Sequence, residues 1–75
     1  MKKILIVGAT GFIGTNLTRY LIEKNYKIRV FIRNKDKFHF KNKKIDIFIG
    51  DLENKIDLDN ALKNIDIAFY LAHSM

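Results

Sequence analysis

GATGFIG, residues 8–14, follows directly on the apolar run KILIV at residues 3–7. Its glycines recur at intervals of three residues, and glycine loses more conformational freedom on folding than any other residue. The apolar, β-branched run before them predicts a strand that is buried on both faces. Apolar residues after them recur at helical spacing and predict a helix over residues 12–24. The three glycines therefore lie where a strand passes into a helix.

Each glycine has a separate role at this junction. Gly8 permits a sharp turn, Gly11 admits a ligand to the main chain, and Gly14 permits close helix packing. The N-terminus of a helix offers unpaired N–H groups and the positive end of the helix dipole, which suit a pyrophosphate. No acidic residue occurs between Gly8 and Tyr20. A glycine triplet alone is a weak signal, but between the strand and the helix of a βαβ unit it predicts nucleotide binding. The alternative is a tight turn without a ligand.

The rest of the chain continues the alternation of strand and helix patterns. Further strands are expected at residues 27–32, 45–49 and 67–72, with a polar connection at 33–44 and a short helix at 57–64. Such alternation implies right-handed crossovers and a parallel sheet. The predicted fold is α/β, the N-terminal half of a Rossmann-type doubly wound parallel sheet with strand order 3-2-1-4, as one partial domain over residues 1–75. The fourth strand would form an apolar open edge, a site of possible self-association.

Composition narrows the classes of protein. The chain has 75 residues, no cysteine and no cluster with the spacing of metal ligands. Its N-terminal apolar run is too short for a signal peptide, and no stretch is long enough for a membrane helix. We therefore expect a cytoplasmic protein without a membrane partner. The net charge of +6 would suit an anionic partner, but the lysines are dispersed and no nucleic-acid-binding motif is present, so we expect no nucleic acid.

The spacing G-x-x-G-x-x-G, together with GDL at residues 50–52, resembles the extended and atypical branches of the short-chain dehydrogenase/reductase superfamily. These branches include sugar-nucleotide epimerases and NmrA-like NAD(P)-binding proteins. AFYLAHSM at residues 68–75 is similar to the corresponding stretch of an atypical NAD(P)H-binding group. The resemblance covers essentially the whole chain but only the first third or so of a family member. It implies a dinucleotide cofactor, and the loop residues predicted to bind it are Gly8, Thr10, Gly11, Phe12, Ile13 and Gly14.

Positions after the later strands complete the predicted cofactor site. Arg33 follows the second strand, where an acidic residue would select NAD and an arginine accommodates the 2′-phosphate of NADP. We therefore predict that NADP is the preferred cofactor and that NAD is the alternative cofactor. The simpler interpretation is that Arg33 is an exposed arginine without a role in binding. The resemblance implies that Asp51 bonds the adenine amino group with Leu52 beside it, although Gly-Asp is also ordinary turn chemistry. It places the backbone around Leu71 and Ala72 near the nicotinamide.

No catalytic residue is predicted. Reductases and epimerases of the resembled superfamily use a Tyr-x-x-x-Lys pair beyond the fifth strand, where the lysine lowers the pKa of the tyrosine. Tyr20 and Lys24 have this spacing, but we expect the first helix to bury Tyr20 against the sheet. His73 and Ser74 follow the fourth strand, and a frayed chain end is the simpler interpretation of them.

Two classes of function stay open. In the first, the chain is the N-terminal cofactor-binding part of an NAD(P)-dependent oxidoreductase or epimerase. In the second, it is a non-catalytic dinucleotide-binding or redox-sensing module, or an inactive truncated fragment. The sequence therefore leaves open whether the chain acts as an enzyme. A reading frame that continues to a Tyr-x-x-x-Lys pair would favour the first class.

Overall fold

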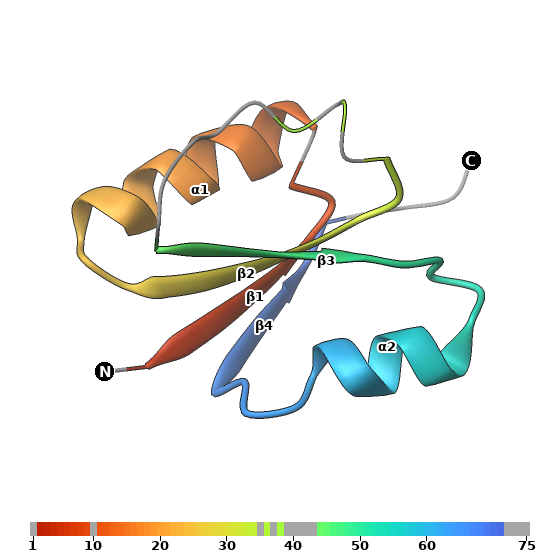
Figure 1. The fold of residues 1–75 in the computed structure, drawn as a ribbon. Coiled ribbons are helices and arrows are strands. Elements are labelled where there is room, and N and C mark those ends of the chain that lie inside the picture. The colour runs from red at the N-terminus through yellow and green to blue at the C-terminus, as the bar shows by residue number, and fades with distance from the viewer. Residues whose placement is uncertain (1, 10, 35, 37, 39–43, 72–75) are drawn as a thin grey trace.

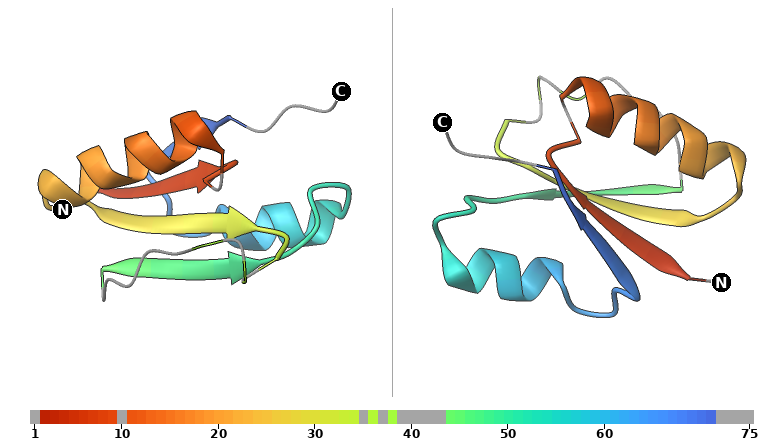
Figure 2. Two further views of the ribbon diagram at one scale, coloured as in Figure 1. Left: turned by 90° about the horizontal axis from the view of Figure 1, so that it is seen from above. Right: turned by 180° about the vertical axis from the view of Figure 1, so that it is seen from behind.

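The structure, a computed structural model, describes residues 2–9, 11–34, 36, 38 and 44–71. Its elements are β1 (Lys3–Val7), α1 (Phe12–Glu23), β2 (Lys27–Ile32), β3 (Ile45–Ile49), α2 (Lys55–Ala61) and β4 (Ile67–Tyr70). The strands form one parallel four-stranded sheet in the order β3-β2-β1-β4. α1 covers one face of this sheet and α2 the other (Figures 1 and 2). The predicted α/β class and strand order are confirmed.

β1 lies inside the sheet, and its residues alternate between two cores. Ile4 and Ile6 are buried with Leu21 of α1 on one face. Leu5 is buried with Ala61 of α2 on the other face. Successive side chains of a strand point to opposite faces, so a strand that is covered on both sides needs an unbroken apolar run. This arrangement confirms the interpretation of residues 3–7.

The boundaries of α2 differ from the prediction, which began the helix at residue 57 and ended it at 64. Asn54 is the N-cap, and its side-chain Oδ1 accepts hydrogen bonds from the N–H groups of Ile56 (3.0 Å) and Asp57 (3.3 Å). At the other end Asn64 has a φ of 62°, which no helix contains. The prediction was wrong at both ends: it missed the N-cap at Asn54, and it ran the helix on to Asn64, past its last residue Ala61.

The buried face of α1 also differs from the prediction. Tyr20 is 55% exposed, with the ammonium of Lys24 5.5 Å from its ring centre. The face that meets the sheet carries Gly14, Thr18 and Leu21. Thr18 is fully buried and its hydroxyl donates to the Gly14 carbonyl oxygen at 2.7 Å. Small residues occupy this face because α1 approaches the sheet closely, so the expectation that Tyr20 is buried was wrong.

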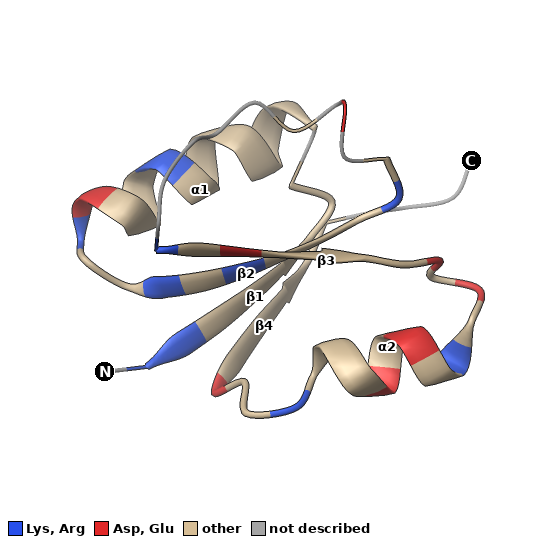
Figure 3. Ribbon diagram, in the orientation of Figure 1, with Lys and Arg blue, Asp and Glu red and all other residues tan. Residues whose placement is uncertain are grey.

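Basic residues predominate near the amino ends of the strands, and acidic residues predominate in the turn before α2 and in α2 itself (Figure 3). Because both helices run antiparallel to the strands, their C-termini lie at the amino ends of the strands, where cations are favoured. Among the described residues, the basic ones at this end are Lys2, Lys3, Lys24, Lys27, Lys44 and Lys63, and the acidic ones are Glu23, Asp46 and Asp66. The turn before α2 and α2 itself are acidic, with Asp51, Glu53, Asp57 and Asp59 against Lys55.

Arg29 of β2 ties α2 to the sheet. Its Nη1 donates to the carbonyl oxygens of Ala61 (2.7 Å) and Lys63 (2.9 Å), which lie at and beyond the C-terminus of α2. Its Nε donates to the Asp46 carboxylate of β3 at 2.9 Å, and the Lys3 ammonium lies 3.4 Å from the same oxygen. The hydrogen bond from Arg29 is the main reason that the pKa of Asp46 lies below its ordinary value, and Lys3 adds to this.

We expect Asp46→Asn to lower stability at neutral pH and to flatten the acid limb of the stability profile. A carboxylate whose pKa is lowered by folding stabilises the protein above its unfolded pKa, and this contribution disappears as the pH falls below about 4 and through the folded pKa. The loss at pH 7 should be about 1 kcal/mol or less, because Asp46 is half exposed. Urea denaturation at pH 7 and pH 3 measures the free energy of unfolding at the two ends of this range. Asp59→Asn, at an exposed carboxylate in α2, is the control, and equal profiles for the two variants would contradict the role of Asp46.

Candidate functional site

The carboxyl ends of all four strands meet at one edge of the sheet. The Gly50 N–H donates to the Ile32 carbonyl oxygen at 3.0 Å, and the Leu71 N–H donates to the Val7 carbonyl oxygen at 2.8 Å. The segments that follow neighbouring strands therefore begin side by side. The chain passes from β1 outward to β2 and β3 and then returns to β4 on the other side of β1. Ligands of open parallel sheets bind at such a reversal of strand order, outside the carboxyl ends.

The turn after β1 contains two glycines that the backbone itself requires. Gly8 has a φ of 94°, in the left-handed region that glycine enters without penalty. The Gly11 N–H donates to the Gly8 carbonyl oxygen at 3.3 Å and closes the turn. A Cβ on Gly14 would lie 2.1 Å from that same oxygen and 2.7 Å from the Cα of Ala9. The sharp turn at Gly8 and the close packing at Gly14 are thus present as predicted.

Gly11 is different, because neither the backbone nor the packing of the described residues requires it. Its φ of −76° and ψ of 173° are extended values that any residue adopts. A Cβ built there would meet the Gly8 carbonyl oxygen at an ordinary contact distance of 3.6 Å. The missing side chain leaves the start of α1 uncovered. A ligand that approaches the main chain at the start of α1 would need the space that a side chain at this position would fill. The folded chain itself does not need that space to be empty.

The two helices differ at their N-termini. α2 has the Asn54 cap and Asp57 in its first turn, whereas α1 follows a glycine and has no acidic residue in its first turn. The first N–H groups of a helix have no partner within the helix, and in α1 these belong to Phe12, Ile13 and Gly14. Both apolar side chains among them are exposed. The positive end of α1 is thus open at the edge where ligands bind in such sheets.

The other predicted site residues that the structure describes lie at the same edge. Arg33 directly follows β2 and is exposed, and Asp51 lies two residues beyond β3. The Asp51 carboxylate accepts from the Glu53 N–H at 2.9 Å, and the Asp51 N–H donates to the Asp57 carboxylate at 3.0 Å. Asp51 therefore forms the turn, and a bond from it to adenine stays a prediction. Leu52 packs against the core on the α2 face.

Four residues named in the sequence analysis lie outside the described residues, and they are Thr10, Ala72, His73 and Ser74. Within the described residues, no group of three or more His, Cys, Asp or Glu side chains is placed to hold a metal ion. No described helix has both the length and the apolar character that crossing a membrane requires.

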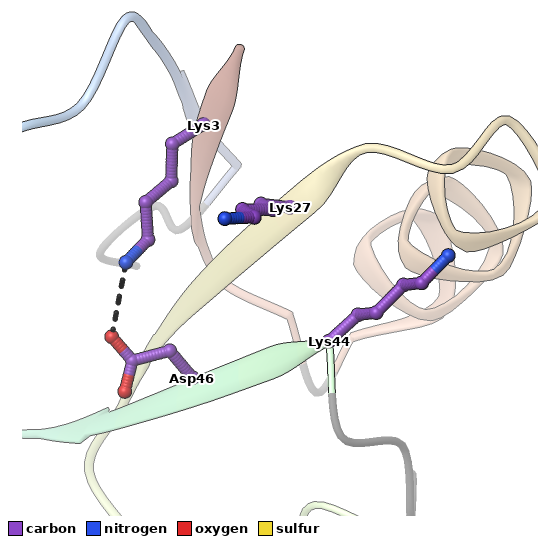
Figure 4. A pocket seen from close by; sticks show the side chains of 4 residues that line it. All are labelled: Lys3, Lys27, Lys44 and Asp46. Atoms are coloured by element: carbon purple, nitrogen blue, oxygen red, sulfur yellow. Dashed lines mark hydrogen bonds and ion pairs between the residues drawn. The ribbon is translucent and has the colours of Figure 1, made fainter. Parts of the chain in front are cut away.

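A cavity of about 290 Å³ lies at the opposite edge of the sheet, near the amino ends of the strands, and is lined by Lys3, Lys27, Lys44 and Asp46 (Figure 4). The Lys44 ammonium donates to the Asn25 side chain at 2.9 Å. Lys3 contacts the Asp46 carboxylate. None of the predicted cofactor-binding residues lines this cavity, so it is separate from the candidate site.

Comparison with known proteins decides the family. The model of the NmrA-like family matches residues 1–75. The chain belongs to the NmrA-like family. Curated relatives of this NmrA-like chain place it more broadly in the extended short-chain dehydrogenase/reductase superfamily, which confirms the resemblance that the glycine spacing indicated.

Two curated relatives illustrate the range of activities around this NmrA-like chain. It is 37% identical over 71 residues to the decarboxylating sterol-4-alpha-carboxylate 3-dehydrogenase of Mus musculus, a match that covers 95% of the chain and 19% of the relative. It is 38% identical over 81 residues to the UDP-glucose 4-epimerase of Rickettsia bellii, covering 95% of the chain and 24% of that enzyme. The chain therefore spans about a fifth to a quarter of the length of these relatives.

Solved structures share the fold of the NmrA-like chain over almost all its residues. A Rossmann-fold NAD(P)-binding family protein from Shigella flexneri aligns with a TM-score of 0.90 and 30% identity, covering 99% of the chain and 39% of that protein. The dTDP-glucose 4,6-dehydratase of Bacillus anthracis, solved in complex with NAD, aligns with a TM-score of 0.83 and 22% identity, covering 99% and 27%. The second likeness shows the fold alone.

Proposed function

We propose that the chain binds NAD(P), with the pyrophosphate at the N-terminus of α1. The observation that carries this proposal is Gly11, whose missing side chain serves neither the backbone nor the packing of the described residues. The uncapped first turn of α1 supports it, because unpaired N–H groups and the helix dipole favour an anion there. The NAD(P)-binding description of the Shigella flexneri protein and the NAD complex of the dehydratase agree with it.

In this proposal the N–H groups of Phe12, Ile13 and Gly14 donate to the pyrophosphate. Asp51 faces the adenine with Leu52 beside it, and the segment around Ala72 lies near the nicotinamide. When bound, the nicotinamide ring supplies or accepts a hydride. The chain itself contributes binding and orientation. The larger function we propose is the cofactor-binding part of an oxidoreductase or epimerase of the superfamily, as the names of the dehydrogenase and epimerase relatives suggest.

A calorimetric titration of the folded chain with NADPH and NADH tests the binding itself. We expect saturable binding of both dinucleotides with one site per chain. Inorganic phosphate at the same concentration is the control, because it lacks the adenosine and nicotinamide parts. If neither dinucleotide saturates a chain shown to be folded by circular dichroism, the proposal is wrong for this chain.

We further propose that NADP is preferred over NAD and that Arg33 is the reason. Arg33 is exposed and directly follows β2, and a guanidinium bonds a phosphate through two parallel N–H groups. Arg33→Ala should weaken NADPH binding by about tenfold, which is about 1.4 kcal/mol, and leave NADH binding nearly unchanged. Arg19→Ala, on an exposed part of α1 where Arg19 bonds Asn16, is the matched control. Equal affinities of the unmodified chain for NADPH and NADH would exclude the preference for NADP. The proposal that the chain binds a dinucleotide would be unaffected by that result.

A non-catalytic dinucleotide-binding or redox-sensing module is the second candidate. The one Tyr-x-x-x-Lys spacing within these 75 residues does not supply the catalytic pair of an oxidoreductase. Tyr20 and Lys24 lie at the C-terminal end of α1 and contact each other, remote from Gly11. They are therefore not placed to act on a cofactor held at the N-terminus of α1. Hydride transfer to a carbonyl substrate by the full reading frame would decide for the oxidoreductase.

A further inference from the structure

Three lysines lie side by side at the amino ends of three neighbouring strands. Lys3 of β1 pairs with Lys27 of β2 in the register of the sheet. Lys44 directly precedes β3, and its carbonyl oxygen accepts from the Ile28 N–H at 3.3 Å. Neighbouring strands of a sheet are about 4.8 Å apart, so one small ligand can reach all three side chains. Together with Asp46, these lysines line the cavity of about 290 Å³ (Figure 4).

The cavity holds more positive than negative charge. Asp46 is the one carboxylate among the described residues that line it. The Asp46 Oδ2 atom already accepts from the Arg29 Nε at 2.9 Å, and the Lys3 ammonium lies 3.4 Å from the same oxygen. Neither ion pair among the described residues includes Lys27. Like charges opposite each other in a sheet are destabilising, so an anion in this cavity would remove an unfavourable interaction.

The ends of the two helices do not account for these lysines. Cations are favoured near the C-termini of helices, and both helices end at this edge of the sheet. The carbonyl oxygens at and beyond the end of α2 accept from Arg29. Those at the end of α1 accept from the main-chain N–H groups of residues 24–26. The helix ends therefore have their hydrogen-bond donors without Lys3 and Lys27.

We propose that this cavity binds an oligophosphate, either free or carried by a nucleotide. An ammonium group has three N–H donors and no acceptor, and it binds phosphate as a point charge. Positive charges on three neighbouring strands suit an anion that carries several negative charges along its length. The described residues of the lining include no aromatic side chain on which a base could stack. The ligand is therefore recognised through its phosphate groups alone.

The lysines contribute unequally to this binding. Lys27 and Lys3 make the first contacts, and the phosphate competes with Asp46 for the Lys3 ammonium. The Lys44 ammonium donates to the Asn25 side chain at 2.9 Å, and its flexible four-carbon stem lets it turn toward the anion. The cavity and the proposed cofactor site lie at opposite ends of the strands, so the two proposals are independent.

Titration of the ¹⁵N-labelled folded chain with tripolyphosphate, followed residue by residue by NMR, tests the site. We expect saturable shifts of the Lys27 and Lys44 amides, whereas the amides of Gly11 and Gly14 report separately on the cofactor site. ATP should shift the lysine amides with a similar affinity. Shifts confined to residues 11–14, or no saturation at the lysines, would overturn the proposal. Much tighter binding of ATP at the lysines would overturn recognition through the phosphates alone.

Three variants separate this cavity from a general attraction of anions to a basic chain. Lys27→Gln should weaken tripolyphosphate binding by about tenfold. Asp46→Asn should strengthen it by about threefold, although it lowers stability, because it removes the carboxylate that competes for Lys3. Lys24→Gln is the matched control, since the Lys24 ammonium lies over the Tyr20 ring at 5.5 Å and does not line the cavity. Equal weakening by Lys24→Gln and Lys27→Gln, or weaker binding by Asp46→Asn, would reject the cavity as the site.

Discussion

Gly11→Asp should abolish dinucleotide binding while leaving the fold at least as stable as before. The backbone at Gly11 is extended and open, so aspartate fits there without strain. Its carboxylate would accept hydrogen bonds from the first N–H groups of α1 and would interact favourably with the helix dipole, together worth about 0.5 kcal/mol or more. The same carboxylate would occupy the proposed pyrophosphate position and repel it. Affinity should fall by about 100-fold or more.

Stability and affinity therefore move in opposite directions, which separates loss of the site from loss of the fold. Gly11→Ser is the matched variant, because it adds a Cβ and a capping hydroxyl but no charge. It should raise the melting temperature slightly and weaken binding less than Gly11→Asp does. Thermal melting followed by circular dichroism and calorimetry with NADPH measure the two quantities. Unchanged affinity in a folded Gly11→Asp variant would mean that the pyrophosphate does not bind at α1.

The sheet could be predicted from the sequence because its signals are local and strong. β1 is an unbroken apolar run, which indicates a strand covered on both faces, and the structure buries Leu5 and Ile6 completely on opposite sides. The strand order then follows from the handedness of crossovers and from the place of the glycine loop. Neither inference needed any contact between residues far apart in the sequence.

What the sequence could not predict depends on such distant contacts. Arg29 donates to carbonyl oxygens that lie 32 and 34 residues further along the chain, and nothing in its neighbourhood indicates this. Tyr20 was expected to be buried because it lies near apolar residues of α1. The helix packs so close to the sheet that the smaller Thr18 is buried there instead. Asn54, by contrast, is an ordinary N-cap residue, and attention to it would have placed the start of α2 correctly.

The site was predicted in unequal parts. The turn at Gly8 and the packing at Gly14 follow from the spacing of the motif and are present. The proposed role of Gly11 in ligand binding depends on the structure, which shows that neither the backbone conformation nor the packing of the described residues requires a glycine there. Asp51 makes turn contacts that an aspartate makes in many proteins, so its position alone does not separate binding from structure. Arg33 is a prediction that only cofactor affinities can decide.

Gly14→Ala should destabilise the fold strongly, against the usual effect of that substitution. In an exposed helix interior, alanine is more favourable than glycine by about 1 kcal/mol. Here the added methyl group would lie 2.1 Å from the Gly8 carbonyl oxygen and 2.7 Å from the Ala9 Cα. These are main-chain atoms of a tight turn, so no side-chain rotation relieves the overlap. α1 would have to move away from β1. The contacts that the buried Thr18 makes with the sheet would then be weakened.

The expected loss is about 3 kcal/mol, at the upper end for overpacking. A chain of 75 residues has a total stability of roughly 4–11 kcal/mol, so the melting temperature should fall by more than about 10 °C. Asn16→Ala, on the exposed face of the same helix, is the control and should not lower it. A higher melting temperature for Gly14→Ala would mean that α1 lies farther from the turn than in the structure. The expected fall would show that Gly14 is needed before any ligand binds, which leaves Gly11 as the glycine of the motif that reports on the cofactor.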